Sequence, residues 1–354
     1  MANPVIDNLV SEYLDGKSPA SEEVAPGDVT LFSGAIKKPK GNFNLRTVIS
    51  TLKKDLFVTR LELKDIPEEI QDLIPTLNEN YVPDREALTA IVNSIEGNEP
   101  ALITGPTGCG KSELLAFVCA HTNRPFIRVN MSEDIDSSMV FGQIGAANGA
   151  TYWENGPASE AAIYGALLNI DEYDAAPAGI MMGFQWLLEH NNKMYLKEKP
   201  GTSKDKTIQP HPNFRVVFTG NTLGQGDDTG HFAGTQVQNT AMLDRIRCSV
   251  QMDYLEPSVE LKMLRAAYPQ VTEDVQKMMI QVANNVRTAY KKMEVGLTVS
   301  PRTLLNWNAK LIQYGNPDEA LTYAFLNKLR GSDRKVVTKL YERTFARNTN
   351  WIAS

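Results

Sequence analysis

The chain has 354 residues, a formal net charge of −6 and 42% hydrophobic residues, and its length predicts two or three domains because a single core seldom grows beyond about 250–300 residues. The acidic balance does not favour nucleic acid or anionic membranes as partners of the whole chain, and there is neither an apolar run that could span a membrane nor a signal-peptide pattern. Three cysteines without metal-ligand spacing indicate reduced thiols, so we expect a cytoplasmic protein.

Residues 1–80 differ in character from the rest of the chain. The first forty are rich in Pro, Gly, Ser and acidic residues and show little periodicity, which is typical of a flexible arm. From Phe43 to Leu63 apolar and polar residues alternate in places, so short strands or one helix are expected there. We interpret residues 1–80 as a partly flexible N-terminal extension. A helix over 84–95 follows, with Asp84 as its N-cap.

A phosphate-binding loop follows a short apolar strand over 101–104. The residues Gly105-Pro-Thr-Gly-Cys-Gly-Lys111-Ser112 fit the pattern G-x-x-x-x-G-K-[ST], and a helix over 112–122 would place its positive dipole end at the phosphates. The glycines let backbone N–H groups face phosphate oxygens, Lys111 supplies charge to the β- and γ-phosphates, and the Ser112 hydroxyl can bind Mg²⁺. The residues predicted here to contact the nucleotide are Gly105, Pro106, Thr107, Gly108, Cys109, Gly110, Lys111, Ser112 and Glu113.

Two adjacent carboxylates follow a predicted buried strand. A strand over 126–130 comes before them, and the polar, Gly-rich segment 131–160 is predicted to be an irregular insertion that projects from the core. The apolar run 166–170 then ends at Asp171 and Glu172, which is a Walker B pattern. We predict that Asp171 holds Mg²⁺ and that Glu172 polarises the attacking water.

An apolar helix over 180–189 is expected to precede a hairpin over 193–208. Lysines in this hairpin mildly favour contact with nucleic acid, but a solvated charged hairpin explains the same residues. A strand over 214–219 follows, and Asn221 at its end is the candidate for orienting the lytic water. The hairpin lysines are Lys193, Lys197, Lys199, Lys204 and Lys206.

From Pro257 onward the apolar residues recur at spacings of three and four, which predicts helices only. Pro257 and Pro301 suit the first turn of a helix. We interpret residues 257–354 as a small helical domain that follows an α/β core over 81–256. The predicted helices cover 257–268, 272–290, 301–314, 317–329 and 332–346.

Together these motifs resemble the AAA+ ATPases, in which Asn221, Arg245 and Arg302 correspond to sensor 1, the arginine finger and sensor 2. The segments 131–160 and 193–208 resemble the helix-2 insert and the pre-sensor-1 hairpin of the MoxR and dynein-related branch. Over roughly residues 82 to 310 the chain looks like the small ATPase subunit of aerobic cobaltochelatase, the CobS type. The motifs that carry this resemblance are Arg128-Val-Asn, Asp171-Glu-Tyr-Asp, Pro210-His-Pro-Asn-Phe-Arg, Gly220-Asn-Thr-Leu-Gly-Gln-Gly-Asp, Gly234-Thr-Gln, Met242-Leu-Asp-Arg and Ser300-Pro-Arg.

The resemblance implies a fold and an assembly. The fold is a doubly wound parallel sheet with the phosphate loop after its first strand, followed by a helical lid. The assembly is a hexameric ring that binds ATP and Mg²⁺ at each subunit interface, where Arg245 reaches the γ-phosphate of a neighbouring subunit. Arg302 is expected to contact nucleotide either on its own subunit or across the interface.

The resemblance also implies a class of function. Such rings usually work with a protein that carries a von Willebrand factor A domain (CobT-like), and they remodel it or promote metal insertion. The narrow version is the chelatase subunit that drives Co²⁺ insertion into a corrin ring with two larger partners. The alternative is a nucleic-acid motor or translocase of the same branch. A third hypothesis, a nucleotide-binding scaffold without turnover, is disfavoured by the complete set Lys111, Ser112, Asp171, Glu172, Asn221 and Arg245.

Overall fold

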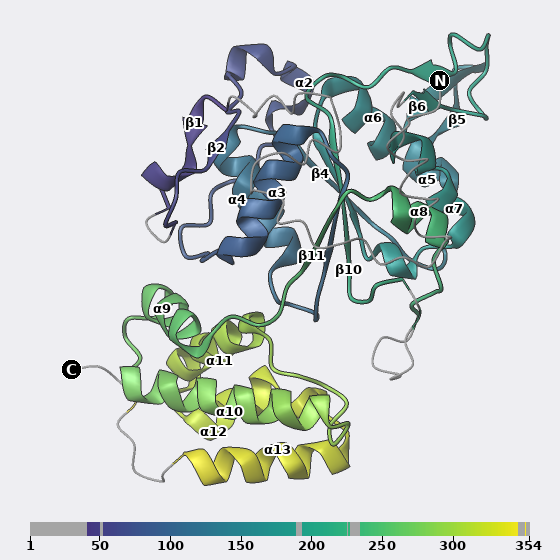
Figure 1. Ribbon diagram of the computed structural model, residues 1–354. Coiled ribbons are helices and arrows are strands. Elements are labelled where there is room, and N and C mark those ends of the chain that lie inside the picture. Colours follow the sequence, from purple (N-terminus) through teal and green to yellow (C-terminus); the bar gives the residue numbers. More distant parts are fainter. Residues whose placement is uncertain are drawn as a thin grey trace, which may run out of the picture. The chain divides into compact units, whose positions relative to one another are not determined.

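The computed structural model (Figure 1) describes residues 41–49, 52–188, 193–224, 226, 234–345 and 351. The arm predicted for the first forty residues lies outside this described part. Within it, strands and helices are interspersed as far as Gln251, and only helices follow from Pro257. None of the helices described is both long and apolar enough to cross a membrane.

Five parallel strands form the central sheet, in the order β11-β3-β10-β7-β4. The three inner strands are runs of apolar residues buried on both faces, as expected for a sheet covered by helices on two sides. Thr219 of β10 pairs with Asp171 of β7, and Asp171 pairs in turn with Asn130 of β4, so the carboxyl ends of these strands meet at one edge. The strands are β3 (Ala101–Thr104), β4 (Phe126–Asn130), β7 (Leu167–Asp171), β10 (Arg215–Gly220) and β11 (Cys248–Gln251).

Helices cover both faces of this sheet (Figure 1). Successive strand residues point to opposite faces, so Leu102 and Phe218 enter one apolar cluster with residues of α5 to α8. Ile103 and Val217 enter a second cluster with residues of α3 and α4. The helices are α3 (Arg85–Gly97), α4 (Lys111–Thr122), α5 (Ser137–Phe141), α6 (Pro157–Tyr164), α7 (Ala178–Met182) and α8 (Thr240–Arg245).

The chain before α3 packs onto the core. Of the two possibilities predicted for this stretch, short strands are present: β1 (Phe43–Asn44) pairs antiparallel with β2 (Phe57–Val58). Leu45, Leu52 and Val58 are buried in the same cluster as the apolar face of α3. Three short helical segments complete this region, namely η1 (Leu45–Thr47), η2 (Leu63–Asp65) and α2 (Glu68–Gln71).

The prediction that segment 131–160 is irregular is wrong. After α5, strands β5 (Gly142–Ala147) and β6 (Ala150–Asn155) form an antiparallel ladder of six residue pairs. Asn148 and Gly149 connect them with φ values of 53° and 76°, and Asn-Gly is the dipeptide that favours a two-residue hairpin turn. The glycines on either side hide this signal, because they make the whole segment resemble a loop.

The chain after Asp171 contains shorter elements than predicted. The helix expected over 180–189 is replaced by α7 and the 3₁₀ segment η4 (Gln185–Leu188), and Gly183, a poor helix former, lies between them. Strands β8 (Met194–Tyr195) and β9 (Thr207–Ile208) pair antiparallel within the predicted hairpin. A 3₁₀ turn, η3 (Tyr173–Ala175), directly follows Glu172.

The C-terminal helices share one apolar core that includes Trp307, Val286 and Phe325. Ser300 caps α11 through a hydrogen bond from the Thr303 backbone N–H. The predicted fold class, a doubly wound parallel sheet followed by an all-helical region, is confirmed. The helices are α9 (Pro257–Ala267), α10 (Glu273–Lys291), α11 (Pro301–Tyr314), α12 (Pro317–Ala324), η5 (Leu326–Lys328) and α13 (Gly331–Thr344).

Candidate nucleotide-binding site

The phosphate loop joins β3 to α4, and its glycines adopt conformations that other residues avoid. Gly108 and Gly110 have φ values of 77° and 101°, in the left-handed region. A Cβ atom at Gly105 would lie 2.2 Å from the carbonyl oxygen of Met252, so the chain leaving β11 leaves no room for a side chain there. The sequence pattern therefore coincides with a backbone that requires glycine.

Lys111 is buried at the start of α4, and its ammonium group bonds back to the loop. Nζ donates to the carbonyl oxygens of Gly105 (2.6 Å) and Pro106 (3.2 Å), and to Oδ1 of Asn221 (3.0 Å). Burial lowers the pKa of Lys111, and the charge of nearby groups such as Asp171 opposes this shift. The carbonyls of Gly105 and Pro106 thus hold a charged amine beside the loop, where it can reach a bound phosphate.

The carboxylate of Asp171 is almost fully buried at the end of β7, and both its oxygens are engaged. Oδ2 accepts hydrogen bonds from Ser112 Oγ (3.2 Å) and Arg128 Nε (2.6 Å). Oδ1 accepts from Thr219 Oγ1 and from the backbone N–H of Glu172. The two residues predicted to bind Mg²⁺, Ser112 and Asp171, are therefore in contact and offer the oxygen ligands that this ion prefers.

Glu172 differs from its neighbour in conformation and in exposure. Its φ and ψ are 54° and 41°, a left-handed conformation that is uncommon for residues other than glycine. Its side chain is exposed and lines the same cavity as Lys111. Asp171 is thus held within the sheet, whereas Glu172 is accessible to a water molecule in the cavity.

Asn221 follows β10 and is fixed by a buried carboxylate. Oδ2 of Asp174 accepts hydrogen bonds from the backbone N–H groups of Asn221 (2.9 Å) and Thr222 (2.7 Å), and from Thr222 Oγ1 (2.8 Å). Asp174 is fully buried. This contact sets the backbone position of Asn221, whose side chain then reaches Lys111.

A cavity of about 610 Å³ brings most of the predicted nucleotide-binding residues together. Residues 107–113, Asp171, Glu172 and Asn221 line it, whereas Gly105 and Pro106 do not line it but bind Lys111. Two further regions of the chain, residues 78–82 and the C-terminal helices, complete the wall. Their contributions include Asn78, Asn80, Tyr81, Val82, Met263, Ala267, Tyr268, Pro301, Arg302 and Leu305.

Residues 78–82 are attached to the phosphate loop and α4. The Tyr81 hydroxyl donates to the Gly110 carbonyl (3.3 Å), and its ring lies against Phe117 with centroids 5.4 Å apart. Asn78 Nδ2 donates to Glu113 Oε1 over 2.7 Å. Glu113, predicted as a nucleotide contact, is therefore also the residue that holds this segment.

The helical region contacts the opposite side of the loop. Tyr254, which precedes α9, donates from its hydroxyl to the Thr107 carbonyl (3.2 Å), and burial raises its pKa to about 12. A Cβ atom at Gly108 would lie 2.7 Å from Cβ of Ser300, so α11 begins directly against the loop. The Arg287 guanidinium lies 4.3 Å from the centroid of the Tyr254 ring.

The two arginines predicted to contact phosphate occupy different places. Arg302 is exposed and lines the cavity of its own chain. Arg245 is the last residue of α8, where it donates to the Ala241 carbonyl (2.6 Å), and it is not among the residues that line the cavity. Only Arg302 is thus brought next to the other predicted residues.

Three residues of the site had no role assigned from the sequence. Arg128 and Asp174 stand inside motifs that carried the resemblance, but the motifs do not reveal their contacts. A charged residue in the middle of a predicted strand was the available sequence signal for Arg128. Tyr254 lies just after the last strand, in a stretch without any motif.

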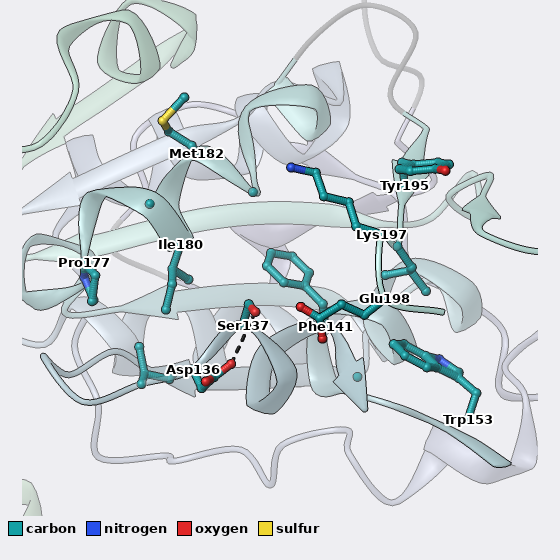
Figure 2. Close-up of a pocket in the computed structure, with 15 residues that line it drawn as sticks. Asp136, Ser137, Phe141, Trp153, Pro177, Ile180, Met182, Tyr195, Lys197 and Glu198 are labelled. Carbon is teal, nitrogen blue, oxygen red and sulfur yellow. Dashed lines mark hydrogen bonds between the residues drawn. The ribbon is translucent and has the colours of Figure 1, made fainter. Parts of the chain in front are cut away.

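A second cavity, of about 730 Å³, lies away from these residues and contains none of the predicted catalytic groups. The insert, α7 and the β8–β9 hairpin surround it. Figure 2 shows the Phe141 ring between Ile180 and the stretch that bears Lys197 and Glu198. This second cavity has the greater volume, but the phosphate loop lies in the first. The first cavity is therefore the site with recognisable chemistry.

Comparison with known proteins places both parts of the chain in described families. Residues 100–233 match the AAA domain of the dynein-related subfamily, and residues 260–344 match the CbbQ/NirQ/NorQ C-terminal family. CobS, an aerobic cobaltochelatase subunit from Sinorhizobium sp, is 31% identical over 281 residues, which cover 77% of this chain and 83% of that protein. NorQ from Paracoccus denitrificans is 24% identical over 250 residues, covering 70% and 87%. CbbQ from Hydrogenophilus thermoluteolus is 27% identical over 161 residues, covering 46% and 55%.

The matched ranges contain most of the predicted residues that line the cavity. The first holds the phosphate loop, Asp171, Glu172 and Asn221, and the second holds Arg302. The family that the sequence motifs predicted is confirmed, and the ATPase activity predicted with it follows from the AAA domain. This chain belongs to the MoxR-type AAA+ ATPases and is a relative of CobS, CbbQ and NorQ.

Proposed function

We propose that this protein assembles into a hexameric ring, as its branch does, and uses Mg-ATP hydrolysis to remodel a protein partner. The proposal rests on the observation that one cavity is lined by Lys111, Ser112, Asp171, Glu172 and Asn221. These residues come from three separate segments of the chain. Each has the chemical character that phosphoryl transfer to water requires.

Nucleotide and metal would be held by groups already in position. Ser112 Oγ and Asp171 Oδ2, 3.2 Å apart, supply hard oxygen ligands for Mg²⁺, which would neutralise charge on the phosphates. The phosphates would lie on the backbone of the loop at the N-terminus of α4, next to Lys111. The apolar side chains of Val82, Met263 and Leu305 offer a surface for the base. ATP as the substrate is proposed from the family.

Hydrolysis requires a positioned water and charge at the γ-phosphate. Glu172 would polarise the water, and Asn221 would orient it from the end of β10. Arg302 would contact the nucleotide of its own subunit. Arg245 lies outside the cavity lining of its own chain, which supports a role at the nucleotide of a neighbouring subunit and hence a ring.

The partner is proposed from the relatives. CobS is a cobaltochelatase subunit, so the narrow form of the proposal is a complex that inserts a metal into a macrocycle. The broader form is a partner with a von Willebrand factor A domain that the ring activates. A nucleic-acid motor is not favoured, because Glu198 and Asp205 dilute the lysines of the β8–β9 hairpin, and Lys206 Nζ donates to the Lys197 carbonyl at 3.3 Å.

A trap experiment tests the proposal. Glu172→Gln should bind ATP without hydrolysing it and so retain its partner, whereas Lys111→Ala should bind neither. Both variants should lose Mg²⁺-dependent ATPase activity, and an unchanged rate in either would show that the site is misassigned. Proteins that co-purify only with Glu172→Gln from native extract identify the client. A von Willebrand-type or chelatase protein supports remodelling, and recovery of DNA or a nuclease instead contradicts it.

A further inference from the structure

Arg128 is bound to the carboxylate that the proposed function assigns to the metal. It lies on β4, next to β7, with its Cα opposite that of Asn169. Its Nε donates to Asp171 Oδ2 at 2.6 Å, and a second guanidinium nitrogen forms an ion pair with the same oxygen. The two side chains differ sharply in exposure, at 52% for Arg128 and 5% for Asp171.

These contacts complete the hydrogen bonding of Asp171. Two carboxylate oxygens offer about four acceptor sites. Oδ1 is taken by Thr219 Oγ1 and the Glu172 N–H, while Oδ2 is taken by Arg128 and Ser112 Oγ. Oδ2 is also the oxygen in contact with Ser112, the other proposed metal ligand. Arg128 and a metal ion would therefore need the same oxygen.

We propose that Arg128 competes with Mg²⁺ for Asp171 and moves to the phosphates when the metal binds. The inference rests on the proposed function of the site. A guanidinium and a divalent cation repel each other and cannot both approach Oδ2 closely. Metal binding is then an exchange of one cation for another at a fixed carboxylate, which Thr219 and the Glu172 N–H keep in place.

The side chain of Arg128 can reach the proposed phosphate position once it leaves Asp171. Its side chain is half exposed and lines the cavity, together with Lys111 and Ser112. The planar guanidinium fork matches two phosphate oxygens as well as it matches a carboxylate. Released from Asp171, Arg128 would lie on the same chain as the nucleotide that it contacts, in contrast to Arg245. The triphosphate and the metal would thus be bound in a coupled way.

The metal-binding midpoint tests the exchange directly. Mn²⁺ serves as a paramagnetic probe, and its binding to the full-length chain with ADP is followed by electron paramagnetic resonance. Arg128→Met removes every donor but keeps a side chain of similar length. We expect it to lower the half-saturating Mn²⁺ concentration about tenfold, because a competing charge-assisted hydrogen bond is lost. An unchanged or raised midpoint overturns the proposal.

Two matched variants distinguish exchange from a general change in charge. Arg302→Met removes a positive charge from the same cavity without touching Asp171, and it should shift the midpoint much less. An equal shift in both variants overturns the proposal. Arg128→Lys keeps the charge but has no fork, so its midpoint should lie between those of wild type and Arg128→Met. If Arg128→Met does not fold, Arg128→Lys serves as the test in its place. A half-saturating Mn²⁺ concentration in Arg128→Lys equal to that of the wild type then overturns the proposal.

The second half of the exchange has its own readout. Arg128→Met should weaken binding of a non-hydrolysable ATP analogue relative to ADP, measured by calorimetry with saturating Mg²⁺, because ADP lacks the γ-phosphate. An unchanged ratio of the two affinities overturns the movement to the phosphates. If the wild-type chain itself binds no Mn-ADP, the proposed function fails. If it binds Mn-ADP and Arg128→Met behaves as wild type, only this inference fails.

Discussion

Lys111 and Asn221, which are 110 residues apart in the chain, share a hydrogen bond of 3.0 Å from Nζ to Oδ1. The same amide oxygen lies 3.4 Å from Thr107 Oγ1. Asn221 thus bonds to the phosphate loop from the end of a neighbouring strand. A ligand that displaces the Asn221 side chain would therefore alter contacts of the phosphate loop and of the end of β10 at the same time.

Asn221→Ala should lower ATP turnover about 10²-fold, the range seen when one positioned polar group is removed from a reacting centre. Nucleotide affinity should change little, because Lys111 still bonds to the carbonyls of Gly105 and Pro106. Steady-state kinetics and direct binding of a fluorescent nucleotide separate the two effects. Loss of affinity as large as in Lys111→Ala would contradict the assignment.

Asp174→Asn should destabilise the core by about 3 kcal/mol, because hydrogen bonds to a buried charged group are lost or weakened. Its Oδ2 atom accepts three of them, from Asn221 and Thr222. Urea unfolding measures the change in free energy. The matched control is Asp134→Asn, an exposed acid that should change stability by no more than about 0.5 kcal/mol. Equal effects in the two variants would rule out this role for Asp174.

Arg245→Ala should reduce ATPase activity about 10³-fold, as expected for an arginine finger. If Arg245 acts across a subunit interface, mixing this variant with Lys111→Ala should restore part of the activity, because some interfaces then combine an intact loop with an intact finger. A mixture of Lys111→Ala and Glu172→Gln is the control, since no subunit in it has a complete site. Absence of recovery in rings shown to exchange subunits would place Arg245 on its own nucleotide.

Glu260→Gln should destabilise the helical region by about 3–5 kcal/mol, since it leaves a buried arginine without its counter-charge. Glu260 is fully buried, and Arg287 binds both its oxygens at 2.9 and 2.6 Å. Thermal unfolding followed by circular dichroism measures the effect. The exposed pair of Glu273 and Lys277 provides the comparison, and Glu273→Gln should change stability far less because water screens an exposed ion pair. Similar losses of stability in the two variants would contradict the expectation that burial makes the Glu260–Arg287 pair more costly to break.

Stability should fall as the pH drops below about 6.5, the ordinary value for histidine. Burial, and secondarily the charge of Arg60, lower the pKa of His121 in the folded chain. The unfolded chain then binds the proton more readily, so acid favours unfolding between the ordinary pKa and the lowered one. His121→Gln should flatten the dependence of the unfolding midpoint on pH in this window. His211, whose pKa is also lowered by burial, contributes in the same direction. If the unfolding midpoint of His121→Gln depends on pH as steeply as that of the wild type, His121 does not contribute to the loss of stability in acid.

The local motifs were predictable from sequence because each depends on neighbours in the chain. The buried run before Gly105 and the one before Asp171 both form the strands expected, and the glycine pattern reports backbone conformations directly. The β5–β6 hairpin was missed for a local reason, since the Asn148-Gly149 turn was hidden among other glycines.

The contacts between motifs were not predictable in the same way. Arg128, Asp171 and Thr219 meet because β4, β7 and β10 are neighbours in the sheet although more than 30 residues separate each strand from the next along the chain. Which residues then face each other depends on strand register. Likewise, Tyr81 and Tyr254 reach the phosphate loop from segments whose residues show no pattern pointing to phosphate.

The left-handed backbone of Glu172 sets the catalytic role proposed for this residue against the stability of the fold. A residue other than glycine in that region raises the energy of the fold by about 1 kcal/mol. Asparagine adopts the same conformation more readily, so under the proposed mechanism Glu172→Asn should give a chain that is inactive and yet harder to unfold.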